Sequence, residues 1–398
     1  MDTQNTPIHI KLWHRDFWLM MLATLSLSMG VYMQIPSLAA HMRDSGYESW
    51  QVGVVIGIMG LGLFLFGPMC GYWVERFRRC RVCTYALLGA MACMAFLYQV
   101  ELMDNTALAF PLMCLGRFLF GACYGLAAMV LFSTLIIDMC ESFMRTEANY
   151  FIAWFARFSL AFGPAISVLL HQWFVPSSVY VMSGLLVIVS FVLVCVIRFP
   201  FKAPYDQEST IGLDRFILPK TLPLFISLVS MAIVAGLLLS IPRDSAFYGL
   251  MAVGFALAIL AEKFAFANAN LKSEVLTGLI MIAAVLLLDI FVKEVDTIQF
   301  VARAILLGMG IGLIGSRYQL FFVKMAKHCQ RGTSQSTYLL SWELGICIGL
   351  FIGAGVLAGD GEAFSADLTL WVTLIMVVFN LITYNFCIHD WYVRHRNR

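Results

Sequence analysis

Twelve apolar runs, each long enough to cross a bilayer, constrain the fold of this chain more than any other feature. A transmembrane helix needs about 20 mainly apolar residues to cross a hydrocarbon core about 30 Å thick. Apolar runs of this length are typical of helices, whose backbone hydrogen bonds are satisfied within the segment. The sequence therefore predicts an all-α polytopic membrane protein with twelve transmembrane helices. We place them at 16–40, 50–74, 82–100, 107–137, 147–171, 177–199, 217–240, 246–266, 275–293, 298–323, 334–358 and 366–388.

The composition excludes a soluble fold. Hydrophobic residues make up 61% of the chain and charged residues 13%, whereas charged residues make up about 25% of an average soluble protein. A soluble fold of 398 residues could not cover that much apolar surface. The net charge of +2 does not indicate a nucleic-acid partner, because no basic domain lies outside the predicted spans.

The chain repeats itself at about half its length. Glu75-Arg76 recurs as Glu262-Lys263. Other pairs at nearly the same spacing are Gly67 and Gly254, Gly125 and Gly312, Tyr150 and Tyr338, Trp154 and Trp342, and Arg117 and Arg303. Such a repeat is typical of a duplicated membrane bundle, in which the ligand site lies between the halves near the bilayer midplane.

One stretch resembles a soluble linker, and it divides the chain between the sixth and seventh spans. This stretch, 200–216, is rich in proline, glycine and acidic residues. We therefore predict an N-terminal six-helix lobe at 1–199 and a C-terminal six-helix lobe at 217–398, related by pseudo-symmetry.

Lys and Arg gather in the connections on one side of the predicted bundle. If the N-terminus is inside, the outer loops hold only Arg43, Arg243 and Lys293. Because positive charge is retained on the cytoplasmic side, we predict a multi-pass protein of the cytoplasmic (plasma) membrane with both termini in the cytoplasm.

Four short motifs fall in order along the spans. The loop at 71–81 matches G-x-x-x-D-R-x-G-R-R/K, with Glu75 in place of Asp and Arg78 in place of Gly. The other motifs are Arg117-x-x-x-Gly121-x-x-x-Gly125, Ser159-x-x-x-Gly163-Pro164-x-x-Ser167 and Gln34-Ile35-Pro36. Together they resemble the major facilitator superfamily. The third is similar to the pattern of its proton-coupled exporters, and the fourth resembles the proline-bearing end of the first helix in its drug and sugar exporters. The resemblance implies two six-helix lobes that work by alternating access.

The loop at 71–81 is predicted to take part in gating. Glu75 can dock against the start of the eleventh span, 332–334, since the free N–H groups and the dipole of a helix N-terminus favour negative charge. The resemblance implies that this latch, with Arg76 and Arg79, holds the inner side shut. The alternative is that the arginines only keep the loop inside.

Charged groups within the spans are the candidates for proton coupling, because each is costly in lipid unless it is paired or faces water. Glu343 is the only acid near the midplane and is the first candidate. Its alternative role is to pair permanently with an arginine of the tenth span. Asp289 is the second acid, nearer a span end. The resemblance implies that Arg117 assists proton movement; its alternative is a hydrogen bond to a backbone carbonyl.

The balance of charges within the spans favours an anionic or zwitterionic solute with an apolar body. We assign four arginines and two acids to the interior of the spans. Arginine recognises carboxylate and phosphate through paired donors. An amphiphilic cation is the opposite prediction, and needs Glu343 unpaired beside aromatic side chains. Arg303 and Arg317 could instead snorkel towards the span ends. The predicted substrate-binding residues are Arg157, Arg303, Arg317, Tyr32, Gln34, Tyr124, Tyr338 and Trp342.

These features predict a secondary active transporter with a small-molecule substrate, protons and the lipid bilayer as its partners. Gly163 and Pro164 can bend the fifth span and are predicted to take part in gating. By resemblance, their motif favours proton-coupled export (antiport). One alternative is proton-coupled uptake (symport) of a small organic acid, sugar or peptide. Another is a membrane sensor or lipid-handling protein that keeps the fold without pumping.

The sequence does not predict an enzyme. The spans hold no paired catalytic carboxylates and no Ser-His-acid set. Cys80-x-x-Cys83 lacks the second ligand pair of a metal site. No cofactor, metal or nucleic acid is expected, and the chain is expected to act as a monomer.

Overall fold

The computed structural model describes residues 12–103, 105–141, 143–174, 177–198, 209–292, 294, 296–327, 330–358 and 362–396. The chain ends, Lys293 and residues 200–208 of the predicted linker lie outside this part. The helices of the first half are α1 (Arg15–Tyr32), α2 (Gln34–Asp44), α3 (Ser49–Gly57), α4 (Met59–Gly62), α5 (Gly67–Arg76), α6 (Arg79–Glu101), α7 (Thr106–Met129), η1 (Val130–Leu135), α8 (Ile136–Met139), α9 (Arg145–Trp173) and α10 (Ser178–Val196). Those of the second half are η2 (Pro219–Thr221), α11 (Leu222–Ser240), α12 (Ser245–Phe264), α13 (Leu271–Phe291), α14 (Thr297–Met325), α15 (Arg331–Phe351), η4 (Ile352–Val356), α16 (Glu362–Thr383), η5 (Tyr384–Ile388) and α17 (His389–His395).

The described residues contain the predicted membrane spans. Eleven helical segments are long and apolar enough to cross a membrane. The predicted span 50–74 corresponds to a bent pair, Ser49–Gly62 with Gly67–Arg76, whose two parts make an angle of 42°. Counted as one span, this pair brings the number to twelve. The all-helical, polytopic fold class is therefore confirmed.

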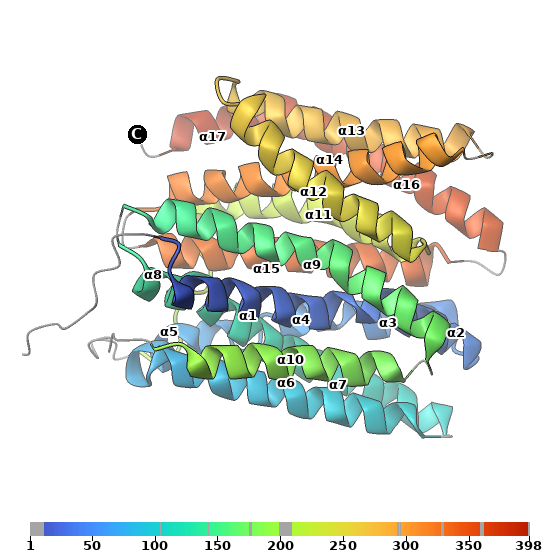
Figure 1. Cartoon of the computed structure of the whole chain (residues 1–398), viewed down its shortest axis with the longest axis horizontal. Coiled ribbons are helices and arrows are strands. Elements are labelled where there is room, and N and C mark those ends of the chain that lie inside the picture. Colours follow the sequence, from blue (N-terminus) through green and yellow to red (C-terminus); the bar gives the residue numbers. More distant parts are fainter. Residues whose placement is uncertain are drawn as a thin grey trace, which may run out of the picture.

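The helices run roughly parallel and form two groups (Figure 1). α6, α7 and α10 lie at one side of the bundle, and α13, α14 and α16 lie at the other. The groups meet where α9 packs against α12, and where α15 packs against α3 and α4. Residues far apart in the sequence therefore face each other in the middle of the bundle.

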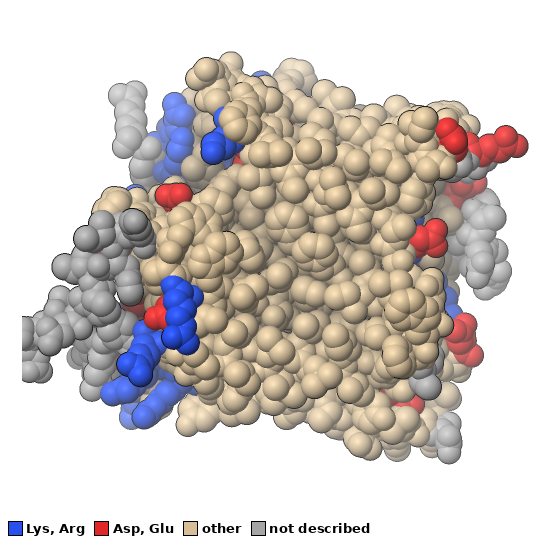
Figure 2. Space-filling view, in the orientation of Figure 1, with Lys and Arg blue, Asp and Glu red and all other residues tan. Residues whose placement is uncertain are grey.

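Charged side chains gather at the two ends of the bundle and leave an apolar belt between them (Figure 2). Lys and Arg predominate at the end where α1 begins, which we call the basic end; Asp and Glu predominate at the opposite, acidic end. Several helices that start at the acidic end have an acid as the N-cap: Glu48 of α3, Asp244 of α12 and Asp296 of α14. A carboxylate is favourable there because the helix dipole is positive at its N-terminus.

The sequence repeat reappears as a repeated helix contact. A Cβ atom on Gly121 of α7 would lie 2.3 Å from the carbonyl oxygen of Met59, and one on Gly308 of α14 would lie 2.2 Å from that of Met251. Backbones this close leave no room for a side chain, and small residues supply such contacts in lipid. The same close backbone contact is thus made in both halves.

Candidate functional site

Glu343 lies between the two halves and is held by tyrosines of the first half. It occupies the middle of the span Arg331–Val356 and is 4% exposed. Its Oε1 accepts hydrogen bonds from the hydroxyl groups of Tyr32 (2.7 Å) and Tyr124 (3.0 Å). Among the described residues no arginine or lysine forms a salt bridge with Glu343. The permanent pairing with an arginine of the tenth span is therefore not what the structure shows.

The break between α1 and α2 positions Tyr32. Tyr32 ends α1 and Met33 separates the two helices. Gly163 of α9 packs against this break, because a Cβ atom there would lie 2.9 Å from the Met33 nitrogen and 3.1 Å from the Tyr32 Cβ. Pro164 follows inside α9 and has no N–H for the helical hydrogen bond. The Gly163-Pro164 pair therefore lies beside Tyr32, a hydrogen-bond donor to Glu343.

Arg157 is a second buried charge at the contact between the halves. It belongs to α9 and is 2% exposed. Its Nη2 donates to the Tyr338 hydroxyl (3.0 Å) and to Gln319 Oε1 (3.4 Å), both on the second half. Its guanidinium also lies 4.6 Å from the ring centre of Trp154. Nε and Nη1 have no hydrogen-bond partner, so this buried cation still offers donors to an anion.

Arg117 is held within the first half. Its Nη1 donates to Gln34 Oε1, and its Nε lies 3.4 Å from the Val55 carbonyl oxygen. Gln34 in turn donates to Ser183 (2.8 Å). The alternative expected for Arg117, a bond to a backbone carbonyl, is therefore present, and Gln34 serves as its partner. Neither residue contacts Glu343 by a hydrogen bond.

Arg303, Arg317 and Asp289 are placed differently from what their predicted roles require. Asp289 forms salt bridges with Arg303 (2.9 Å) and Arg243 near the acidic end. Arg317 pairs with Glu274 at the start of α13. Because both arginines are paired with acids inside the second half, their geometry argues against the predicted substrate contact. The paired state of Asp289 likewise argues against a role in carrying protons.

At the basic end, the start of α15 is bound by residues other than the predicted Glu75. In the described part of the chain Glu75 forms no hydrogen bond or salt bridge. Instead, Thr333 at the start of α15 donates to Asp214 (2.9 Å) and accepts from the Arg215 backbone N–H (2.9 Å). Glu75 does not bind there because the segment before α11 lies against the N-terminus of α15. The Leu218 N–H of this segment also donates to Thr337 (2.9 Å).

The arginines of the predicted latch have other partners. Arg76 contacts Tyr72 on its own helix. Arg79 forms a salt bridge with Asp138 on α8. Burial raises the pKa of Asp138, which lies just beyond the span, and the Arg79 guanidinium opposes that shift. These contacts tie helices of the first half together at the basic end.

Contacts between the halves are found at both ends as well as in the middle. Ser336 donates to Ser133 (3.0 Å) towards the basic end. Towards the acidic end, Arg43 lies 3.5 Å from the Ala354 carbonyl oxygen. The two halves are therefore in contact on both sides of Glu343 and Arg157.

Sequence reasoning gave no role to Glu262, although it found Glu262 as the repeat of Glu75. Its carboxylate accepts from Tyr150 (2.6 Å) on the first half and from Ser316. A cavity of about 350 Å³ lies beside it, lined also by Arg317 and Gln319. The repeat was the signal that could have singled out this residue.

The remaining aromatic candidate, Trp342, is buried on α15 next to Glu343. In the part of the chain that the structure describes, no group of three or more His, Cys, Asp or Glu side chains could hold a metal ion. The buried polar groups at the interface are therefore a carboxylate, a guanidinium and the hydroxyl and amide groups around them.

Solved transporters share this fold. The chain resembles a mutant form of the nucleoside transporter NupG with a TM-score of 0.68, 14% identity, and coverage of 93% of this chain and 98% of that one. It resembles the human organic anion transporter MFSD10 (TETRAN) with a TM-score of 0.69, 13% identity, and coverage of 93% and 99%. It also resembles an auto-inhibited peptide transporter of the POT family with a TM-score of 0.68, 11% identity, and coverage of 97% of this chain and 98% of that one.

A search of curated protein sequences found no match. The family model of the Major Facilitator Superfamily, however, matches residues 20–350, which is most of the chain. This match agrees with the motifs, the repeat and the fold. The chain belongs to the Major Facilitator Superfamily of membrane transporters.

Proposed function

We propose that this protein is a proton-coupled secondary transporter that works by alternating access between two lobes, residues 1–199 and 217–398. The observation that carries the proposal is the placement of Glu343: a buried carboxyl group of one half whose hydrogen-bond donors, Tyr32 and Tyr124, belong to the other half. Movement of the halves must change these bonds, and so must a change in the charge of the carboxyl group.

Tyrosine partners suit a group that changes its protonation state. A tyrosine hydroxyl donates to a carboxylate and can also accept from a protonated carboxyl group. A guanidinium can only donate, so it would hold the carboxylate ionised. Protonation of Glu343 would therefore alter the contact between the halves without leaving a buried cation unpaired, and a proton can bias which side opens.

Arg157 is the proposed substrate anchor. Its unpartnered Nε and Nη1 can bind a carboxylate or a phosphate through paired hydrogen bonds. Trp154, Tyr338 and Trp342 supply aromatic surface on both halves for an apolar body. The substrate is thus a small anionic or amphiphilic organic solute.

Export by antiport is the proposed direction, supported by the resemblance of the motif around Gly163 and Pro164 to that of proton-coupled exporters. The proposed orientation places the basic end and both termini in the cytoplasm, because positive charge is retained there. The proposed setting is the cytoplasmic membrane, with a single chain as the working unit.

Purified protein in liposomes that contain a pH-sensitive dye tests this function. Organic anions, sugars and amphiphilic cations are added outside, each to the wild type and to Glu343→Gln. Inward movement of a solute should make the interior alkaline in antiport and acidic in symport. We expect an alkaline response to an anionic or amphiphilic solute, and its loss in Glu343→Gln with solute exchange retained.

The matched control is Glu294→Gln, which makes the same change at an exposed acid at the acidic end. It should respond like the wild type. Proton movement that survives Glu343→Gln would remove Glu343 from the coupling role. An acidic response would establish uptake, and no response to any solute class would favour the sensor or lipid-handling alternative.

A further inference from the structure

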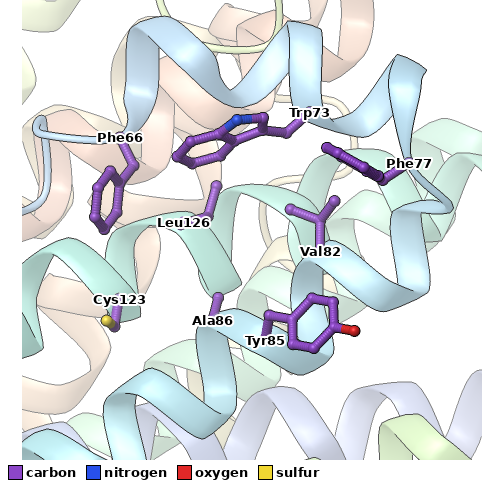
Figure 3. A pocket seen from close by; sticks show the side chains of 8 residues that line it. All are labelled: Phe66, Trp73, Phe77, Val82, Tyr85, Ala86, Cys123 and Leu126. Carbon is purple, nitrogen blue, oxygen red and sulfur yellow. The ribbon is translucent and has the colours of Figure 1, made fainter.

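An apolar groove lies between α5, α6 and α7 of the first half (Figure 3). Its volume is about 330 Å³. Phe66, Trp73 and Phe77 face side chains of α6 and α7 across it. The lining residues are Phe66, Trp73, Phe77, Val82, Tyr85, Ala86, Cys123 and Leu126.

The groove opens towards the surroundings of the bundle near its basic end. Tyr85 is 70% exposed and Phe77 is 53% exposed, whereas Val82 and Leu126 form a buried floor. Val82, Tyr85 and Ala86 belong to the first two turns of α6, which begins at the basic end. In a membrane this surface would face lipid chains rather than water.

Two arginines lie at the start of α6, next to the groove. Arg81 precedes Tyr85 by four residues, and residues four apart lie on one face of a helix. Arg78 directly precedes the helix and has an extended backbone. Both arginines are exposed, and neither forms a salt bridge with a described residue. Arg78 is also the N-cap of α6 and makes no side-chain cap hydrogen bond, so this helix start can add backbone donors for an anion.

We propose that this groove is a binding site for an anionic phospholipid of the leaflet at the basic end. One acyl chain would lie along the groove between α5, α6 and α7, and the phosphate would lie between Arg78 and Arg81. The combination of an apolar groove in the membrane with a basic group at its membrane surface matches the two parts of a phospholipid. A basic residue near an anionic surface strengthens binding by about 1 kcal/mol, equivalent to roughly fivefold.

A second copy of the chain fits the same surface less well. A symmetric contact through this groove would bring the same arginines of both copies towards each other. Like charges facing each other oppose association. A phospholipid instead supplies the opposite charge and needs no partner of complementary shape.

The lipid would also touch a helix that contacts the segment before α11. Gly67 starts α5 between Phe66 of the groove and the ring of Phe216, and a Cβ atom on Gly67 would lie 2.1 Å from that ring. Phe216 directly follows Asp214 and Arg215, which bind the start of α15. A lipid that packs on α5 therefore lies one helix away from this segment.

Trp73 provides a probe inside the groove. Brominated acyl chains quench tryptophan fluorescence on contact, and the chain has nine tryptophans. The Trp73 contribution is the difference between the wild type and Trp73→Phe. Full-length protein is placed in bilayers of phosphatidylcholine with increasing fractions of brominated phosphatidylglycerol or brominated phosphatidylcholine, at constant ionic strength.

We expect the Trp73 contribution to be quenched at a much lower fraction of phosphatidylglycerol than of phosphatidylcholine. The double substitution Arg78→Gln with Arg81→Gln should raise the phosphatidylglycerol fraction needed for quenching by at least about tenfold, because each arginine strengthens binding by roughly fivefold. The matched control is Arg198→Gln with Arg394→Gln, which removes two other exposed arginines at the basic end and should leave quenching unchanged. Ala86→Phe fills the groove and should abolish quenching by both lipids.

Other outcomes would overturn the proposal. Equal quenching by both lipids would make the groove an ordinary lipid contact without charge selection. Quenching that survives Ala86→Phe would place the chain elsewhere. Protection of Trp73 from both lipids, with a dimer in cross-linking, would identify a second copy as the occupant. Unchanged melting temperatures of the variants in detergent would show that lost quenching is not lost folding.

Discussion

Glu343 and Asp289 are both carboxylates buried in spans of the second half, yet their surroundings differ in kind. Asp289 is held by two arginines of its own half near the acidic end. Glu343 is held by two tyrosines of the other half near the middle of its span. A charge paired within one half keeps its partners when the halves move, so Asp289 fits a structural role. The bonds of Glu343 cannot all survive such a movement.

The arginines divide in the same way. Arg303 and Arg317 are neutralised by acids within the second half, whereas Arg157 reaches Tyr338 and Gln319 across the interface and keeps free donors. A position across the interface combined with an unpaired charge is therefore what distinguishes the residues that we propose to be functional. The position of a charge along the sequence does not reveal it.

The largest expected effect would test the structural side of this comparison. Asp289→Asn keeps the shape of the side chain but leaves the buried Arg303 and the partly exposed Arg243 without their acid. Breaking a buried pair costs about 3–5 kcal/mol, so the thermal unfolding temperature in detergent should fall markedly. The protein that remains folded should still couple solute to protons. Stable folding with lost coupling would instead return Asp289 to the role predicted from the sequence.

A second substitution tests the functional side. Arg157→Gln should weaken the apparent affinity for an anionic solute by roughly 30-fold, since a hydrogen bond to a charged group contributes about 2 kcal/mol. Arg157→Lys should weaken this affinity by an intermediate factor, because lysine keeps the charge without the paired donors. Initial transport rates over a range of solute concentrations measure this. Arg303→Lys is the control and should leave the affinity unchanged; an equal effect of both would contradict the comparison.

The smallest expected effect concerns the hydroxyl donors. Tyr32→Phe and Tyr124→Phe each remove one hydrogen bond to Glu343, a loss of about 1 kcal/mol, and should slow coupled transport about fivefold. In the Glu343→Gln background, which is expected to retain solute exchange, the same substitutions should have little further effect on the exchange rate, because residues of one network are not additive. Full additivity in this double-mutant cycle would show that the tyrosines act elsewhere.

Several contacts could be anticipated from particular residues. Gly121 and Gly308 occupy equivalent places in the repeat, and both form close backbone contacts. Arg117 could be expected to bond a backbone carbonyl, and it does. Such contacts can be anticipated because close packing of small residues and burial of charge leave few solutions in lipid.

The latch at the basic end shows where such reasoning fails. Glu75 had the right chemistry for the start of α15, but Asp214 and the Arg215 N–H bind Thr333 there. Two acids on different segments were equally plausible partners for one helix N-terminus. Only the path of the chain before α11 decides which of the two acids contacts the start of α15.

By itself, the sequence determined the twelve spans, the charge difference between the two ends and the family, because lipid admits only long apolar helices and each of these features is local or periodic. The tertiary structure alone decided which charges meet. Glu343 faces Tyr32 and Tyr124, and Arg157 faces Tyr338, because α15 of the second half meets α1, α7 and α9 of the first half only when the halves pack. Partners so distant in the chain leave no periodic trace in its sequence.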